Sequence, residues 1–173
     1  DGDSLCRNGD VVVVTLNHRL NIIGFLDLSE YGEEYRYSAN LGMADLVAAL
    51  QWIKENIAAF VGDPDNVTVF GQSAGGGSVS LLSVMKEANQ YFQKIIAQSG
   101  SVYAAMPVGC ETAQSRTNAL LEYTGCKTMD DIMALTEEEL HEAYVNAVNK
   151  FMSSPYYGNE VLPEAPIELY KKG

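Results

Sequence analysis

The stretch FGQSAGGG, residues 70–77, places Ser73 among four glycines directly after an apolar run. Gly71, Ser73 and Gly75 form the pattern G-x-S-x-G. Because a strand signal precedes this pattern and a helix signal follows it, we expect the serine at a sharp strand-to-helix turn. Such a turn strains the backbone of its central residue. We therefore expect Gly71 and Gly75 to remove side chains that would collide with the neighbouring strand and helix. Gly76, Gly77 and Ser78 are expected to let the helix pack tightly on the sheet.

A serine in this turn can act as a nucleophile. Its hydroxyl would project above the carboxyl edge of a sheet, and the N–H group of Ala74 would lie at the helix start, where it can donate to an oxyanion. Two other interpretations stay open from the pattern alone. The serine could be incidental to a tight turn, or the glycines could bind phosphate. The absence of G-x-G-x-x-G and of G-K-[ST] disfavours the phosphate site.

The rest of the chain alternates strand and helix signals. Residues 11–16, VVVVTL, are apolar without alternation, which predicts a central strand covered on both faces. Apolar side chains recur at three- and four-residue spacing over residues 41–60, which predicts an amphipathic helix. Further strands are predicted at 67–70 and 94–98, and residues 111–153 are mostly helical in pattern. This order indicates the α/β class with a parallel sheet, followed by a helical region.

Capping-box patterns predict the first residues of two helices within the helical region. Thr128 and Asp131 have the spacing of a capping box, and so do Thr136 and Glu139. Each threonine is therefore expected to be the N-cap of a short helix.

Composition excludes several classes of function. The chain has 173 residues, with 11 basic and 23 acidic side chains, so its net charge of −12 argues against a nucleic-acid partner. No apolar stretch approaches the length of a membrane span, and the first ten residues lack a signal-peptide pattern. We expect Cys6, Cys110 and Cys126 to be reduced, although the last two could be bridged in an oxidising compartment. We favour a cytoplasmic location and expect neither a metal nor a cofactor.

Three colinear runs resemble the type-B carboxylesterase family, the α/β-hydrolases related to cholinesterases and para-nitrobenzyl esterases. The runs are GDVVVVTLNHRLNIIGFL at 9–26, NLGMADLVAALQWIKENIAAFVGDPDNVTVFGQSAGGGSVS at 40–80 and IIAQSGS at 95–101. Residues 102–173 resemble the family's following helical region more loosely. The resemblance implies a partial α/β-hydrolase fold. We expect residues 1–173 to form one partial domain, with the core strands, helices and nucleophile turn in 1–101 and a mainly helical part in 102–173.

The resemblance also implies an activity, the hydrolysis of small carboxylic esters through an acyl-serine intermediate. Ser73 would be the nucleophile and the Ala74 N–H group an oxyanion donor, with Gly71, Gln72 and Gly75 supporting the turn. Gln72 departs from the family, since many relatives have glutamate there.

Other matched positions are assigned by the same resemblance. Ser99 resembles the family's supporting serine near the catalytic acid, although a polar strand end explains it equally well. Asn40 and Asp45 match the family pattern N-x-G-x-x-D and are expected to make structural hydrogen bonds. His18 stands where the family usually has tyrosine. His141 is expected on an exposed helix surface.

The catalytic base and acid are not expected within this chain. In α/β-hydrolases the order is nucleophile, acid, histidine, so His18 precedes Ser73 in the wrong place. The resemblance puts the glycine-rich oxyanion loop, the acid and the histidine outside residues 1–173, and the chain alone is expected to be inactive. The alternatives are a catalytically inert fragment and a binding or adhesion protein of the same fold. Self-association, or association with missing flanking segments, is expected because cut sheets expose edges and apolar faces.

Overall fold

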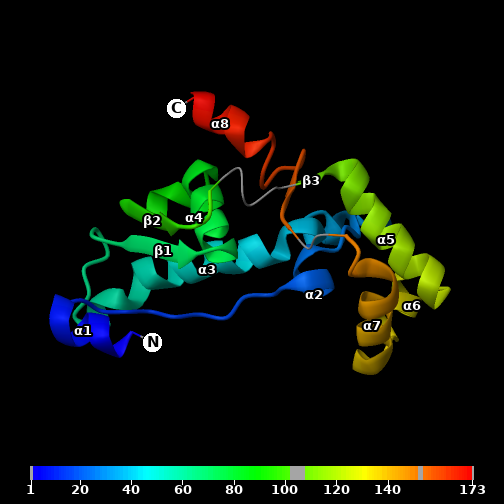
Figure 1. Ribbon diagram of the computed structural model, residues 1–173, viewed down its shortest axis with the longest axis horizontal. Coiled ribbons are helices and arrows are strands. Elements are labelled where there is room, and N and C mark those ends of the chain that lie inside the picture. The colour runs from blue at the N-terminus through cyan, green and yellow to red at the C-terminus, as the bar shows by residue number, and fades with distance from the viewer. Residues whose placement is uncertain (1, 102–107, 152–153, 173) are drawn as a thin grey trace. The chain divides into compact units, whose positions relative to one another are not determined.

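The computed structural model describes residues 2–101, 108–151 and 154–172 (Figure 1). The chain forms two compact units. The elbow unit comprises Asp1–His18 and Met43–Ala105, and the helical unit comprises Arg19–Gly42 and Met106–Gly173. One partial domain over the whole chain stays a prediction.

The elbow unit is organised around a two-stranded parallel sheet. Strands β1 (Thr68–Gln72) and β2 (Lys94–Gln98) pair from Thr68 opposite Lys94 to Gln72 opposite Gln98. Helix α4 (Ala74–Val84) follows β1 and packs on both strands (Figure 1). The short 3-10 helix η5 (Asn89–Tyr91) then leads into β2. The predicted β-α-β order with parallel strands is confirmed for this part of the chain.

Polar contacts set the point at which β1 begins. The Asp65 N–H donates to Asp63 Oδ1 over 2.8 Å, which closes the turn before the strand, and Lys54 Nζ lies 2.6 Å from Asp65 Oδ1. The Val67 N–H donates to Gln93 Oε1 over 2.7 Å. The turn residues therefore align the first residues of the two strands before the ladder starts.

The amphipathic helix predicted over residues 41–60 is confirmed. It consists of helix α3 (Leu41–Asn56) and the 3-10 helix η4 (Ile57–Phe60). Leu50, Ile53 and Ile57 are buried at the predicted spacing. The helical run ends at Val61, which has φ 66° and ψ 14°.

Val61 is an unfavourable residue for this helix end. Its side chain is 95% exposed, so no packing compensates the left-handed conformation, which costs a residue with a Cβ roughly 1–2 kcal/mol. Replacing Val61 with glycine should therefore raise the free energy of unfolding by about 1 kcal/mol, after the entropy cost of glycine is subtracted. Urea unfolding measures this change. Val61→Ala keeps the Cβ and should recover less than half of the gain, and a destabilised glycine variant would contradict the argument.

The prediction of a strand at residues 11–16 is wrong. These residues form no strand between helix α1 (Asp3–Gly9) and helix α2 (Asn21–Phe25). The side chains of Val11, Val12, Val14 and Leu16 are 40–50% exposed. A strand requires hydrogen-bonded neighbours as well as apolar side chains. In the part of the chain that the structure describes, β1 and β2 pair with each other and leave this run without a partner strand.

The helical unit confirms the helical pattern of residues 111–153. Its segments are α2, the 3-10 helices η1 (Ser29–Tyr31), η2 (Glu33–Tyr35) and η3 (Ser38–Asn40), α5 (Cys110–Thr124), α6 (Met129–Met133), α7 (Glu137–Ala143), the π-helix η6 (Tyr144–Val148) and α8 (Pro166–Lys172). Strands β3 (Val108–Gly109) and β4 (Tyr156–Tyr157) form a short parallel pair. Leu26, Leu120, Ala143 and Val148 form a buried apolar cluster.

Both predicted capping boxes are present. The Thr128 hydroxyl accepts from the Asp131 N–H over 3.2 Å, and the Asp131 carboxylate accepts from the Thr128 N–H over 2.9 Å. Thr136 and Glu139 make the same reciprocal pair at the start of α7. These two helix starts are therefore local features of the sequence.

A buried polar network joins distant segments of the helical unit. Asn40 pairs with the backbone of Tyr156, since its Oδ1 accepts from the Tyr156 N–H over 2.8 Å and its Nδ2 donates to the Tyr156 carbonyl over 2.9 Å. The Tyr156 hydroxyl donates to the Phe25 carbonyl over 2.8 Å and accepts from Arg116 Nη1 over 2.9 Å. The structural role predicted for Asn40 is confirmed. Asp45 is half-buried on α3, and its predicted role stays a prediction.

Arg116 is the most unusual member of this network. Its side chain is 1% exposed, and its guanidinium lies over the Tyr156 ring, 4.8 Å from the ring centre. It also donates to the Ser154 carbonyl over 3.3 Å, while its Nε has no hydrogen-bond partner among the residues that the structure describes. Burial lowers the pKa of Arg116. The buried guanidinium of Arg116 is therefore stabilised by neutral oxygen acceptors and by the face of the Tyr156 ring.

The Tyr156 hydroxyl gives the stability of the chain a pH dependence at alkaline pH. Burial raises the pKa of Tyr156 to about 12, against the opposing effect of the Arg116 charge. Folding favours the neutral hydroxyl, so this group contributes about 3 kcal/mol to the free energy of unfolding at pH values below its unfolded pKa of about 10. That contribution is lost as the pH rises through the folded pKa of about 12. Urea unfolding at pH 9 to 12 should show a decrease that Tyr156→Phe lacks. The same decrease in both proteins would contradict this assignment.

Candidate active site

Ser73 lies in the turn between β1 and α4, and its backbone is strained. Strand β1 ends at Gln72 and α4 begins at Ala74, as the sequence pattern predicts. Ser73 has φ 56° and ψ −119°. A non-glycine residue held at such a sparsely populated conformation costs roughly 1–3 kcal/mol, which surrounding contacts must offset. The side chain of Ser73 is exposed.

Both peptide groups of Ser73 are held by hydrogen bonds. Its N–H donates to the Gln98 carbonyl at the end of β2 over 2.9 Å. Its carbonyl accepts from the Gly77 N–H in the first turn of α4 over 3.0 Å. The strand on one side and the helix on the other therefore fix the direction of the Ser73 side chain.

The glycines around Ser73 differ in whether the structure leaves room for a Cβ atom at their positions. A Cβ added to Gly71 would lie 2.5 Å from the backbone of Gly75, so the predicted need for a glycine is confirmed there. A Cβ on Gly75 would meet no described atom within 4 Å, so the same prediction is wrong for Gly75. The tight position is instead Gly76, where a Cβ would lie 2.9 Å from the Gln98 carbonyl oxygen. The first turn of α4 points Gly76, not Gly75, at the sheet.

The backbone N–H group of Ala74 lies at the start of α4, where it can donate to a negatively charged oxygen. Ala74 is the first residue of α4 and is exposed. The first N–H groups of a helix have no acceptor within the helix, and the helix dipole is positive at this end. The Ala74 N–H is therefore suited to stabilise an oxyanion formed at Ser73. Gln72, the last residue of β1, is exposed and adds no charge beside the nucleophile.

Ser99 lies at the same edge of the sheet as Ser73. Gln72 pairs with Gln98, so Ser73 and Ser99 are the next residues on two neighbouring parallel strands. Ser99 is exposed and has a positive φ of 50°. The hydroxyl role assigned by resemblance stays a prediction, and the backbone conformation is a feature that the sequence did not indicate.

No base is paired with Ser73 in the described chain. Among the described residues, no hydrogen bond joins the Ser73 hydroxyl to a histidine or a carboxylate. His141 is exposed on α7, as predicted, and His18 is half-buried. An unassisted serine hydroxyl remains a neutral alcohol at pH 7 and is a poor nucleophile.

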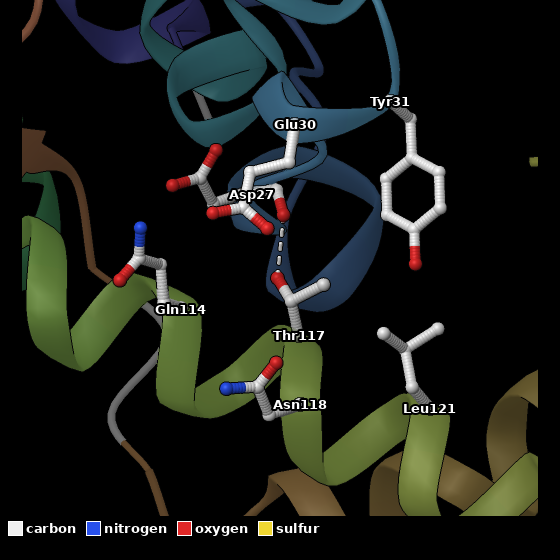
Figure 2. Close-up of a pocket in the computed structure, with 7 residues that line it drawn as sticks. All are labelled: Asp27, Glu30, Tyr31, Gln114, Thr117, Asn118 and Leu121. Atoms are coloured by element: carbon white, nitrogen blue, oxygen red, sulfur yellow. Dashed lines mark hydrogen bonds between the residues drawn. The ribbon is translucent and has the colours of Figure 1, made fainter. Parts of the chain in front are cut away.

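The described pockets do not contain Ser73. Figure 2 shows a pocket of the helical unit, in which the Thr117 hydroxyl donates to the Asp27 carbonyl over 2.6 Å. Its volume is about 30 Å³, which is room for little more than one water molecule. The lining residues are Asp27, Glu30, Tyr31, Gln114, Thr117, Asn118 and Leu121. An open groove of about 460 Å³ lies along Tyr123, Asn146 and Lys150 of the same unit.

Three further features of the described residues bear on the sequence predictions. The described residues contain no group of three or more His, Cys, Asp or Glu side chains arranged to hold a metal ion. None of their helices combines the length and apolar character needed to cross a membrane. Cys6 and Cys126 are free thiols, and the side chain of Cys110 lies outside the described residues.

Comparison with known proteins explains this strand-turn-helix arrangement. A sequence model of the carboxylesterase family matches residues 1–173. The chain belongs to the carboxylesterase family. The para-nitrobenzyl esterase of Bacillus subtilis (strain 168) is 41% identical over 182 residues, which cover 100% of the chain and 36% of that esterase. Human neuroligin-3 is 32% identical over 180 residues, covering 100% of the chain and 21% of that protein.

Solved carboxylesterases share the fold of the chain. The carboxylesterase of Geobacillus stearothermophilus superimposes with a TM-score of 0.94 at 42% identity, covering 100% of the chain and 36% of that structure. The predicted α/β-hydrolase fold and the predicted family are confirmed. The chain spans about a third of the length of these esterases.

The sequence predicted that Gly76, with Gly77 and Ser78, lets the helix pack on the sheet, and the close approach of Gly76 to the Gln98 carbonyl confirms this for Gly76. Sequence reasoning missed the positive φ of Ser99, because serine carries no preference for that conformation.

Proposed function

We propose that the chain supplies the nucleophile of a serine carboxylesterase, and that Ser73 is this residue. The observation that carries the proposal is the strained Ser73 backbone, held between β2 and the first turn of α4 with the Ala74 N–H beside it. Proteins retain such strain mainly where it positions a functional group. Gly71 and Gln72 support the turn from the end of β1.

The reaction takes place in two stages. Ser73 Oγ attacks the ester carbonyl carbon, and a histidine takes the hydroxyl proton while the Ala74 N–H stabilises the oxyanion. The histidine then returns the proton to the leaving alcohol. Loss of the alcohol leaves the acyl group bonded to Ser73 as the acyl-serine. Water then attacks the acyl carbon by the same route, releases the acid and restores Ser73.

The remaining groups are assigned to segments outside residues 1–173. Neither His18 nor His141 follows Ser73 in a position suited to a base, and the family order requires the acid and histidine to follow the nucleophile. We propose that these segments also supply a second oxyanion N–H group. The Ser99 hydroxyl then lies near the acid. The substrate is a small carboxylic ester.

A binding role without catalysis is the second candidate. The neuroligins among the relatives show that the family is not limited to proteins named as esterases. The intact strand-turn-helix arrangement at Ser73 favours the esterase. We further propose that the chain binds no nucleic acid and no membrane, requires no cofactor, associates with itself or its flanking segments, and works in the cytoplasm.

Covalent labelling tests the proposed nucleophile. Residues 1–173 replace the matching segment of the Bacillus subtilis para-nitrobenzyl esterase, which supplies a complete enzyme around Ser73. A fluorophosphonate probe should then label Ser73 and should not label Ser99, as read by peptide mass spectrometry. A folded hybrid that is not labelled within residues 1–173 would refute the proposed role of Ser73.

A further inference from the structure

The segment that follows β2 makes close backbone contact with Ser73. After Gln98 accepts the Ser73 N–H, Ser99 turns the chain with its positive φ of 50°. This turn brings Gly100 against the nucleophile, since a Cβ added to Gly100 would lie 2.2 Å from the Ser73 carbonyl oxygen. The absence of a side chain at residue 100 is therefore a condition for the observed Ser73 conformation.

The same position also meets the first turn of α4. A Cβ on Gly100 would lie 2.7 Å from the Gly77 nitrogen and 2.9 Å from the Gly76 carbonyl carbon. The Gly77 N–H is the donor that holds the Ser73 carbonyl over 3.0 Å. A methyl group at residue 100 would thus push into this hydrogen bond. The three nearest atoms all belong to the backbone, so no side-chain rotation relieves the collision with them.

We propose that Gly100 is a positioning residue for Ser73, and that Ser99 acts through its left-handed backbone to keep Gly100 in place. The inference rests on the proposed role of Ser73 as the nucleophile. The two hydrogen bonds of Ser73 set the direction of its Oγ relative to the Ala74 N–H, and Gly100 keeps the space in which they form. A displacement of about 1 Å in such a site can reduce the rate by about 100-fold.

A thiol at position 73 reports this geometry without requiring hydrolysis. In Ser73→Cys, the start of α4 should lower the thiol pKa below its usual value of about 8.5. The pKa is obtained from the pH dependence of iodoacetamide alkylation of the 173-residue chain. Peptide mass spectrometry follows position 73 separately from the three native cysteines.

Two glycine substitutions in this background form a matched pair. Gly100→Ala should raise the thiol pKa by about half a unit or more towards 8.5, because it displaces the thiol from the helix start. Gly75→Ala adds the same methyl group where no described atom lies within 4 Å, and it should leave the thiol pKa unchanged. Equal thiol pKa values in the two folded variants would overturn the proposal.

Substitutions of Ser99 decide the question if Gly100→Ala does not fold, as judged by circular dichroism. Ser99→Gly accepts a positive φ and should leave the thiol pKa unchanged, whereas the β-branched Ser99→Val resists it and should raise the thiol pKa. An equal effect of both substitutions, or no effect of either, would overturn the proposal.

The two proposals fail in different experiments. An absence of fluorophosphonate labelling in the hybrid esterase would refute the nucleophile and leave the thiol pattern intact. Equal thiol pKa values would refute the role of Gly100 and leave the labelling intact.

Discussion

Replacing Ser73 with alanine in the hybrid esterase should lower kcat for para-nitrophenyl butyrate by about 10⁴- to 10⁶-fold, with little change in KM. The loss is large because the hydroxyl forms and breaks a covalent bond in both stages of the reaction. Substrate binding depends on pocket contacts that the substitution leaves in place. Initial rates over a range of substrate concentrations separate the two constants.

Two controls define the result. Ser83→Ala removes another hydroxyl from α4, one that donates to the Ser80 carbonyl over 2.7 Å, and should change kcat less than about threefold. The 173-residue chain alone should hydrolyse the ester no faster than its own Ser73→Ala variant, because no described base is paired with the serine. A hybrid whose turnover survives Ser73→Ala would exclude Ser73 as the nucleophile.

Replacing Tyr156 with phenylalanine should lower the free energy of unfolding by about 4 kcal/mol, because two buried polar groups each lose a partner. One is the Phe25 carbonyl, which accepts from the Tyr156 hydroxyl over 2.8 Å. The other is Arg116 Nη1, which donates to that hydroxyl over 2.9 Å. Arg116 Nε already lacks a partner within the described part of the chain, so the buried charge would be left with fewer acceptors still. Urea unfolding near pH 7 measures the change.

Tyr123→Phe is the matched control for this substitution. The Tyr123 hydroxyl accepts one hydrogen bond, from Asn146 Nδ2 over 3.1 Å, and its side chain is exposed. Water can replace that partner, so the variant should stay within about 0.5 kcal/mol of the wild type. A similar stability of both variants would show that the buried network contributes no more than a surface hydrogen bond.

Some features of this carboxylesterase chain followed from short stretches of sequence. The capping boxes at Thr128 and Thr136 formed as predicted, because each depends on residues three positions apart. The strand-turn-helix arrangement around Ser73 also formed as predicted, since Gly71 and the neighbouring apolar run lie within a few residues of it. Local chemistry determined these elements.

The site was predictable only in part, because its tight contacts come from another strand. The sequence pointed to Gly75 and, for helix packing, to Gly76, yet a Cβ on Gly75 would meet no described atom within 4 Å, and Gly100, which no pattern indicated, lies against Ser73. Which side of the helix faces the sheet depends on how α4 packs, and a pattern of five residues does not contain that information.

By itself, the sequence determined the family, the parallel β-α-β order, the helix caps and the position of the strained serine, because each rests on residues close together in the chain. Only the tertiary structure decided the rest. The apolar run 11–16 has strand chemistry but no neighbouring strand among the described residues, so it forms no ladder there. Arg116 and Tyr156 are 40 residues apart in the chain, and Tyr156 and Phe25 are 131 apart. A backbone ladder requires a neighbouring strand, and a buried hydrogen bond requires a second polar group, both of which come from distant parts of the chain. A local sequence pattern does not identify these partners.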